Sequence, residues 1–129
     1  MKISIFLIVA CCAVALCQEP NKDILKIGTD CAKENGVTDK EYMDYHAGKI
    51  KGADVKENLK CTNKCFLIKN GFMDESGKFM PEVFKTKMAG MDPKVLTEGL
   101  EKCKGKEAAN VCEKAFLISD CFLQIKLQG

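Results

Sequence analysis

The sequence predicts an all-α domain of six short helices that three disulfides cross-link. Cap residues and prolines recur just before apolar stretches of helical spacing, and glycines recur just after them. No stretch alternates apolar and polar residues between hairpin turns, so no sheet is expected. Six of the nine cysteines follow an N-terminal targeting segment, and an even number in a short exported chain is typical of a disulfide framework.

The N-terminal segment predicts secretion. Lys2 supplies a positive charge, residues 3–16 are apolar except for Ser4, and no acidic residue appears before Glu19. This apolar run is shorter than the ~20 residues that span a bilayer. We therefore interpret residues 1–17 as a signal peptide cleaved after Cys17 and residues 18–129 as the helical domain, secreted to the extracellular fluid without stable membrane insertion.

Start and stop signals place the helices in order along the chain. Thr38, followed three residues later by Glu41, has the pattern of a capping box. Asp54 is the expected cap of the third helix, and Asp92 followed by Pro93 has the order of a cap and a first helical residue. The helices are expected over residues 22–35, 38–47, 55–70, 81–89, 93–103 and 106–127.

Charge and composition argue against several function classes. The full chain has a formal net charge of only +2, its charges are interspersed, and every basic residue is lysine. Without the planar guanidinium of arginine, nucleic acid is not an expected partner. His46, the only histidine, is expected on the surface at a helix end, with no companion at metal-ligand spacing and no catalytic motif around it. We therefore expect no enzyme, no cofactor and no metal.

Helix geometry restricts the disulfide pairing without deciding it. Cys61 and Cys65 stand at i and i+4, with Cβ atoms ~5–6 Å apart, whereas a disulfide needs ~3.5–4.5 Å. Cys112 and Cys121 are nine residues apart, about half a turn beyond whole turns, so they face opposite sides of the last helix. Excluding these two pairs leaves ten of the 15 possible pairings of six cysteines open.

The cysteine spacing resembles that of a known family. The six cysteines are separated by 29, 3, 37, 8 and 8 residues, and the stretch over residues 60–78 reads KCTNKCFLIKNGFMDESGK. Both features are similar to the insect odorant-binding proteins of the pheromone and general odorant-binding family. In that family six helices enclose an apolar cavity, and the bridges join the first cysteine to the third, the second to the fifth and the fourth to the sixth. The resemblance thus implies Cys31–Cys65, Cys61–Cys112 and Cys103–Cys121.

The resemblance also implies a function. It implies a secreted carrier that binds small hydrophobic molecules, such as odorants or pheromones, and transports them through extracellular fluid. The expected partner is a small apolar ligand, together with a chemosensory receptor or a second copy of the chain. Phenylalanine and methionine side chains are numerous enough to line an adaptable apolar cavity. Ligand contacts are expected from one face of the third helix, which carries Leu59, Thr62 and Phe66. One face of the last helix contributes Ala115, Phe116, Ser119, Phe122 and Leu123, and the fourth helix contributes Met88.

Two other readings of the same chain are a lipid-interacting protein of saposin type and a non-sensory carrier of lipids or fatty acids. Saposins are also helical with three bridges, but they pair cysteines near both ends through closely spaced doublets that this chain lacks. A secreted phospholipase would need a histidine beside an aspartate and a calcium loop. The segment from Asp74 to Gly77 is too short for that loop, because its glycine stands fourth rather than sixth.

The targeting segment and the cysteine count predict the mass of the secreted protein. Expression in insect cells should yield a protein that begins at Gln18 and has no free thiol, since the three remaining cysteines leave with the signal peptide. Intact mass spectrometry before and after alkylation measures both properties. A mature chain that retains Cys17, or one that takes up the alkylating reagent without prior reduction, would contradict this interpretation.

Overall fold

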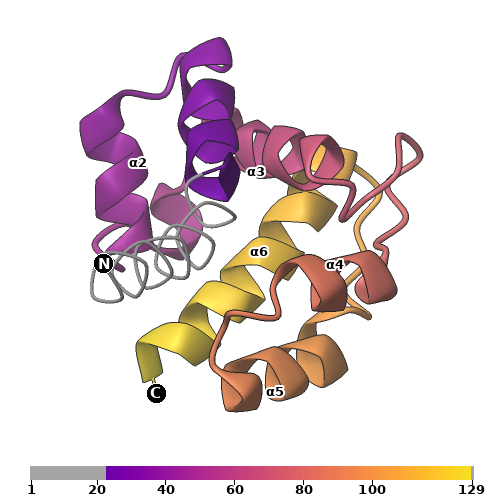
Figure 1. Cartoon of the computed structure of the whole chain (residues 1–129). Helices are drawn as coiled ribbons and strands as arrows, with labels where there is room; N and C mark the ends of the chain where they lie inside the picture. Colours follow the sequence, from indigo (N-terminus) through magenta and orange to yellow (C-terminus); the bar gives the residue numbers. More distant parts are fainter. Residues whose placement is uncertain (1–22, 129) are drawn as a thin grey trace, which may run out of the picture.

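The computed structural model describes residues 23–128, which form six α-helices and one 3₁₀ turn with no β-strand (Figure 1). The predicted all-α fold is confirmed. The first helix covers residues 23–34, and the predicted signal peptide, residues 1–17, lies outside the described residues. The remaining elements are α2 (Asp39–His46), η1 (Gly52–Asp54), α3 (Glu57–Lys69), α4 (Pro81–Lys87), α5 (Pro93–Cys103) and α6 (Val111–Gln128).

Three helices begin where the sequence predicts. The hydroxyl oxygen of Thr38 accepts the backbone N–H of Glu41 at 3.1 Å and caps α2. The Asp92 carboxylate accepts the backbone N–H of Lys94 at 2.9 Å and caps α5. Pro81 occupies the first turn of α4, where its missing N–H has no intrahelical partner to lose.

The predicted starts of the third and last helices are wrong. Tertiary packing shifts the first of these starts, and a capping side chain closer to the observed start fixes the second. Asp54 ends the 3₁₀ turn instead of capping α3, because Val55 is extended and buries its side chain at 5% exposure. α3 therefore begins at Glu57. The last helix begins at Val111, five residues later than expected from residue 106, and Asn110 accepts the backbone N–H of Glu113 at 3.1 Å.

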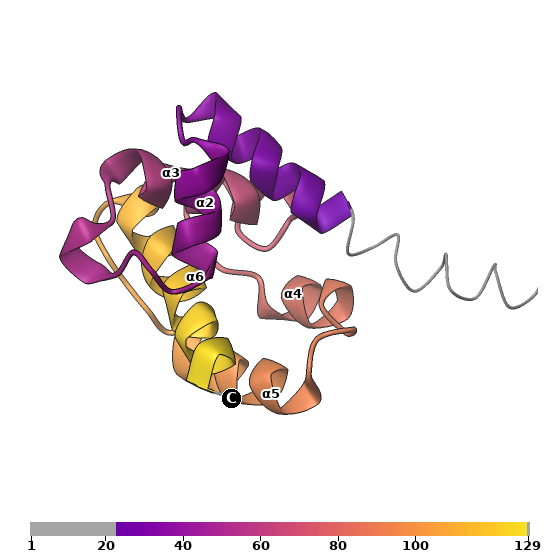
Figure 2. The same ribbon diagram turned by 90° about the vertical axis from the view of Figure 1, so that its left-hand side faces the viewer.

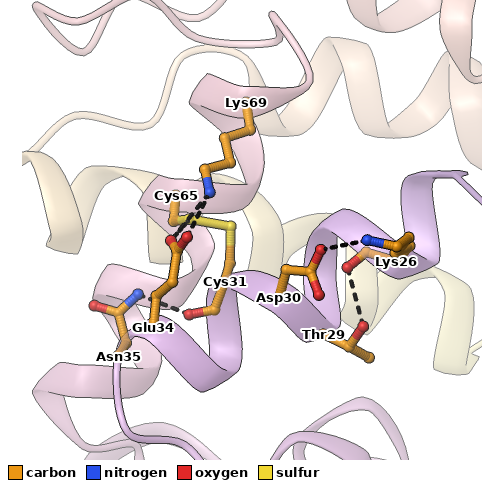
Figure 3. Close-up of polar contacts among 8 residues, drawn as sticks. All are labelled: Lys26, Thr29, Asp30, Cys31, Glu34, Asn35, Cys65 and Lys69. Atoms are coloured by element: carbon orange, nitrogen blue, oxygen red, sulfur yellow. Dashed lines mark hydrogen bonds and ion pairs between the residues drawn. A yellow bond between two sulfur atoms is a disulfide. The ribbon is translucent and has the colours of Figure 1, made fainter.

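The three disulfides join four helices in series. Cys31–Cys65 links the first helix to α3, Cys61–Cys112 links α3 to α6, and Cys103–Cys121 links α5 to α6. These are the pairs that the family resemblance implies. Figure 3 shows the first link with the Glu34 carboxylate beside it, 2.8 Å from the ammonium of Lys69. Both partners of this ion pair are about half exposed, so the disulfide and not the ion pair is the main tie at this contact.

Helix α6 separates two hydrophobic cores. It packs closely against α3 and α5, and Figure 1 shows it crossing the molecule between α2 and the pair α4 and α5. The phenylalanine core consists of Leu67, Phe72, Met73, Phe79, Phe84, Cys103, Ala115, Ile118 and Phe122. The α2 core consists of Ala32, Val37, Tyr45, Val55, Leu59, Phe116 and Leu123. Figure 2, turned by 90° so that the α2 side of Figure 1 faces the viewer, shows α2 set apart from α4 and α5. Within residues 23–128, no helix has both the length and the apolar character needed to cross a bilayer.

The bridges should differ in how much they stabilise the fold. Replacing Cys61 and Cys112 by alanine should lower the free energy of unfolding by about 4 kcal/mol, and replacing Cys103 and Cys121 by about 3 kcal/mol, because closing a longer loop removes more entropy from the unfolded chain. The two bridges enclose sequence separations of 51 and 18 residues. Urea unfolding of the two double variants beside the wild type measures both values. A reversed ranking would show that native-state packing, not loop entropy, decides the stability.

Candidate functional site

A cavity of about 150 Å³ lies where the phenylalanine core and the α2 core meet. Its wall takes residues from α2, α3, α4 and α6 and from the segment after α4. The lining residues are Tyr42, Tyr45, His46, Thr62, Asn63, Phe66, Leu67, Phe84, Met88, Met91, Ile118, Ser119, Phe122, Leu123 and Lys126. Most of these side chains are apolar, so the cavity suits a ligand that binds mainly by leaving water.

Aromatic rings and methionines form the apolar part of the wall. The rings of Phe84 and Phe122 lie 4.6 Å apart between centroids, at 8% exposure or less. Phe66 and the side chains of Met88 and Met91 are only half buried. Because methionine is unbranched and flexible, the two methionines allow this part of the wall to adapt its shape to different ligands.

The α2 side of the cavity carries the two tyrosines. The ring of His46 stands edge-on to both, with centroids 4.5 Å from Tyr42 and 5.2 Å from Tyr45. The Tyr45 hydroxyl donates to a carboxylate oxygen of Asp120 at 3.3 Å, which ties α2 to α6. Burial raises the pKa of both tyrosines, and the charge of Asp120 raises the pKa of Tyr45 further. Both phenols therefore stay protonated over the physiological range.

The rim of the cavity is polar. His46 and Lys126 line it while both remain exposed to solvent. Partial burial of the imidazole lowers the pKa of His46 below its ordinary value, and the positive charge of Lys126 acts in the same direction. At neutral pH this rim therefore presents one lysine cation and an uncharged imidazole.

One polar group in the wall has no partner. Thr62 donates its hydroxyl to the carbonyl of Asn58 at 2.8 Å, and the Asn63 amide donates to the carbonyl of Leu59 at 3.2 Å. The hydroxyl oxygen of Ser119 is buried, and it makes no hydrogen bond to any described residue. An unsatisfied hydroxyl costs free energy that a ligand oxygen or N–H at this position would recover.

The structure brings together six of the nine predicted contact residues in this wall. They are Thr62, Phe66, Met88, Ser119, Phe122 and Leu123. Leu59 and Phe116 lie instead in the α2 core, and Ala115 lies in the phenylalanine core. The predicted ligand-binding faces of α3 and α6 therefore do not line the cavity over their whole width. Part of each face packs into one of the two cores. Phe116 is also covered by Lys60, whose ammonium lies 5.3 Å from the ring centroid. We find no cavity contact for these three.

Several lining residues were not among the nine predicted contact residues. On α2, Tyr42, Tyr45 and His46 are spaced by three and four residues and share one face, which is a helical pattern that sequence inspection can detect. Nothing in the sequence indicates what that face packs against, because α2 carries no cysteine. His46 does lie at a helix end on the surface, as expected, but its place on the cavity rim was missed. The other lining residues outside the predicted contact set are Asn63, Leu67, Phe84, Met91, Ile118 and Lys126.

Two clusters in residues 23–128 have the residue types of a metal site. One contains Glu34 with the bridge Cys31–Cys65, and the other contains Glu57 with the bridge Cys61–Cys112. In each cluster the two sulfurs are bonded to each other and offer no thiolate. A single carboxylate is left, which is too few ligands to hold a metal ion.

Comparison with known proteins agrees with the observed fold. The profile of the PBP/GOBP family matches residues 14–125. The chain is 29% identical over 110 residues to general odorant-binding protein 56a of Drosophila melanogaster, which covers 84% of this chain and 77% of that protein. Its structure is similar to that of a fatty acid binding protein, OBP56a, from the oral disk of the blowfly Phormia regina. The TM-score is 0.63 at 23% identity, and the match covers 87% of this chain and 96% of the blowfly chain. Odorant-binding protein dmelOBP28a of Drosophila melanogaster gives a TM-score of 0.66 at 21% identity, with the same coverage.

The lowered pKa of His46 predicts how stability depends on pH. Below the ordinary value of 6.5 the unfolded chain takes up a proton at His46 more readily than the folded chain. The contribution of His46 is therefore fully present above that value and is lost as the pH falls toward the folded pKa. Between pH 7.5 and pH 5, the free energy of unfolding of His46→Gln should fall by less than that of the wild type.

Urea unfolding at several pH values measures this difference. Carboxylates that titrate in the same range act in both proteins and cancel in the comparison. Identical pH profiles would show that solvent screens the exposed imidazole from its surroundings.

Proposed function

This chain belongs to the PBP/GOBP family, whose members carry small hydrophobic ligands and are not enzymes, and we propose that it carries small molecules with one neutral polar group on an apolar body. Alcohols, aldehydes and esters are such molecules. The apolar body lies among Phe66, Phe84 and Phe122, and the polar group lies at Ser119.

The unpartnered hydroxyl of Ser119 is the observation that carries this proposal. It can donate to a carbonyl or ether oxygen, and it can accept from an alcohol. A pure hydrocarbon leaves the hydroxyl unsatisfied, so the cavity favours an oxygenated ligand over a hydrocarbon of the same shape. The apolar surroundings supply the remaining affinity, at about 25 cal/mol for each Å² of apolar surface removed from water.

The size of the cavity supports small ligands. Its volume of about 150 Å³ matches that of an engineered apolar cavity which binds benzene. A longer ligand has to extend past the half-buried methionines, Met88 and Met91, toward the rim. We expect one ring or a short chain to be enclosed, and longer chains to be partly exposed or to need movement of the wall.

A second ligand class, fatty acids, is favoured by the rim. Lys126 places a cation beside the cavity, and His46 gains a proton more easily once a carboxylate lies near it. The blowfly protein of similar fold is described as a fatty acid binding protein. In this arrangement the carboxylate stays at the rim and the chain points inward, so that the acid depends on Lys126 and not on Ser119.

The remaining parts of the proposal concern where the carrier acts. It is secreted by means of the signal peptide over residues 1–17 and acts in extracellular fluid, as family members typically do. Delivery to a chemosensory receptor and formation of a homodimer stay predictions from the sequence. Sedimentation of the secreted protein with and without ligand tests the homodimer.

Removing the hydroxyl of Ser119 should weaken binding of alcohols selectively. Ser119→Ala should lower the affinity for 1-hexanol by about 1 kcal/mol, or roughly fivefold, because one neutral hydrogen bond is lost. The affinity for hexane should not fall, because hexane has no polar group. Displacement of a fluorescent apolar probe measures both ligands. Thr86→Ala is the matched control, since it removes a helical hydroxyl on an exposed side chain of α4.

The same assay separates the two ligand classes. If hexanoate loses affinity in Lys126→Gln while 1-hexanol does not, the carboxylate binds at the rim as the second class requires. Equal loss of hexanol and hexane in Ser119→Ala would instead show that the substitution changes the shape of the cavity, and would remove the support for a hydrogen bond at Ser119.

A further inference from the structure

A glycine outside the cavity lies directly behind one of the cavity's walls. Gly99 is in the interior of α5 and is buried. Its φ is negative, so the backbone at this position does not require glycine. Glycine in a helix interior is less stable than alanine there. The position of Gly99 therefore needs an explanation outside its own backbone.

The explanation is close approach by Phe122 of α6. A Cβ atom placed on Gly99 would overlap the Phe122 ring, meeting its Cδ1 and Cε1 atoms well inside van der Waals contact and its Cζ atom at 3.2 Å. These atoms belong to the ring of a buried side chain at 8% exposure, so relieving the overlap requires the ring itself to shift. The missing side chain of Gly99 is what allows the ring to lie against the backbone of α5.

The ring of Phe122 is enclosed by α5 and by two other aromatic rings. Its centroid lies 4.6 Å from that of Phe84 and 6.5 Å from that of Phe79. The ring also lines the cavity. A ring displaced from α5 would collide with Phe84 in one direction and with Phe79 in another. The cavity, in contrast, offers it empty space. Because the packed interior yields less readily than the cavity, the ring would move into the cavity.

On this basis we propose that Gly99 determines the size of ligand that the cavity accepts. By omitting a side chain it holds Phe122 back against α5 and keeps open the space that the ligand body occupies. Gly99 touches no ligand itself and acts through Phe122. The inference rests on the proposed function, because it concerns the same cavity.

A second glycine has a similar arrangement but a weaker effect. A Cβ atom on Gly28, in the first helix, would overlap the Tyr42 hydroxyl and lie 3.6 Å from Phe66. Tyr42 is half buried, so its hydroxyl end can turn toward solvent when it is displaced. Size selection is therefore assigned to Gly99, where the ring has no such exit.

The test is the dependence of affinity on ligand length. Gly99→Ala should bind 1-hexanol nearly as well as the wild type and 1-decanol about tenfold more weakly, since lost space in an apolar pocket penalises the larger ligand. Titration calorimetry with 1-hexanol, 1-octanol and 1-decanol gives the three affinities. Gly105→Ala is the control, because its φ is also not positive and a Cβ atom there meets nothing within 4 Å. Its profile should match the wild type.

A rescue variant keeps the test decisive. Combining Gly99→Ala with Phe122→Leu gives the new methyl group room, and should restore the affinity for 1-decanol relative to 1-hexanol. If circular dichroism shows that Gly99→Ala is unfolded, the inference is tested with the double variant alone. A wild-type length profile supports the inference, and an unfolded protein or a continued loss of 1-decanol overturns it.

Two results separate failure of the inference from failure of the proposed function. A wild type that binds none of the alcohols contradicts the proposed function. A wild type that binds them, together with a folded Gly99→Ala whose affinity is unchanged or falls equally at every chain length, contradicts the role of Gly99 alone.

Discussion

The covalent attachment of α6 on two sides is the constraint on which the rest of the structure depends. Cys112 joins it to α3 and Cys121 joins it to α5, and the bridge from Cys31 to Cys65 adds the first helix to this series. The bridges oppose unfolding by restricting the unfolded chain, so less of the stability has to come from a fully packed interior. A small domain with two separate cores therefore tolerates an unfilled space between them.

The helices outside that series, α2 and α4, are held by packing and a few polar contacts. Tyr45 bonds to Asp120 on α6, and Lys87 of α4 donates to the carbonyl of Asn70 at 2.6 Å. Both helices also supply cavity wall, through the tyrosines on α2 and through Phe84 on α4. The cavity thus has one side on cross-linked helices and another on helices without a disulfide. Changes of shape that admit different ligands are least costly on the second side.

How far the sequence predicts this arrangement depends on whether local chemistry decides each feature. The caps at Thr38 and Asp92 were predictable because a single side chain satisfies nearby backbone N–H groups. The start of α3 was not, because burial of Val55 is a tertiary event. Thr62 and Ser119, predicted as contacts from helical spacing on the two cross-linked helices, both line the cavity. The α2 residues were not among the predicted contacts, because no covalent tie shows where that helix packs.

The placement of the tyrosines gives the protein a built-in optical signal. The chain has no tryptophan and only two tyrosines, Tyr42 and Tyr45, and both line the cavity. Ultraviolet emission excited near 280 nm therefore arises from the cavity wall alone, without background from other indole or phenol groups. We expect the entry of a ligand to change the polarity around both rings, including that of Tyr45, whose hydroxyl bonds to Asp120. On that expectation, fluorescence or near-ultraviolet circular dichroism should report ligand occupancy in the unlabelled protein.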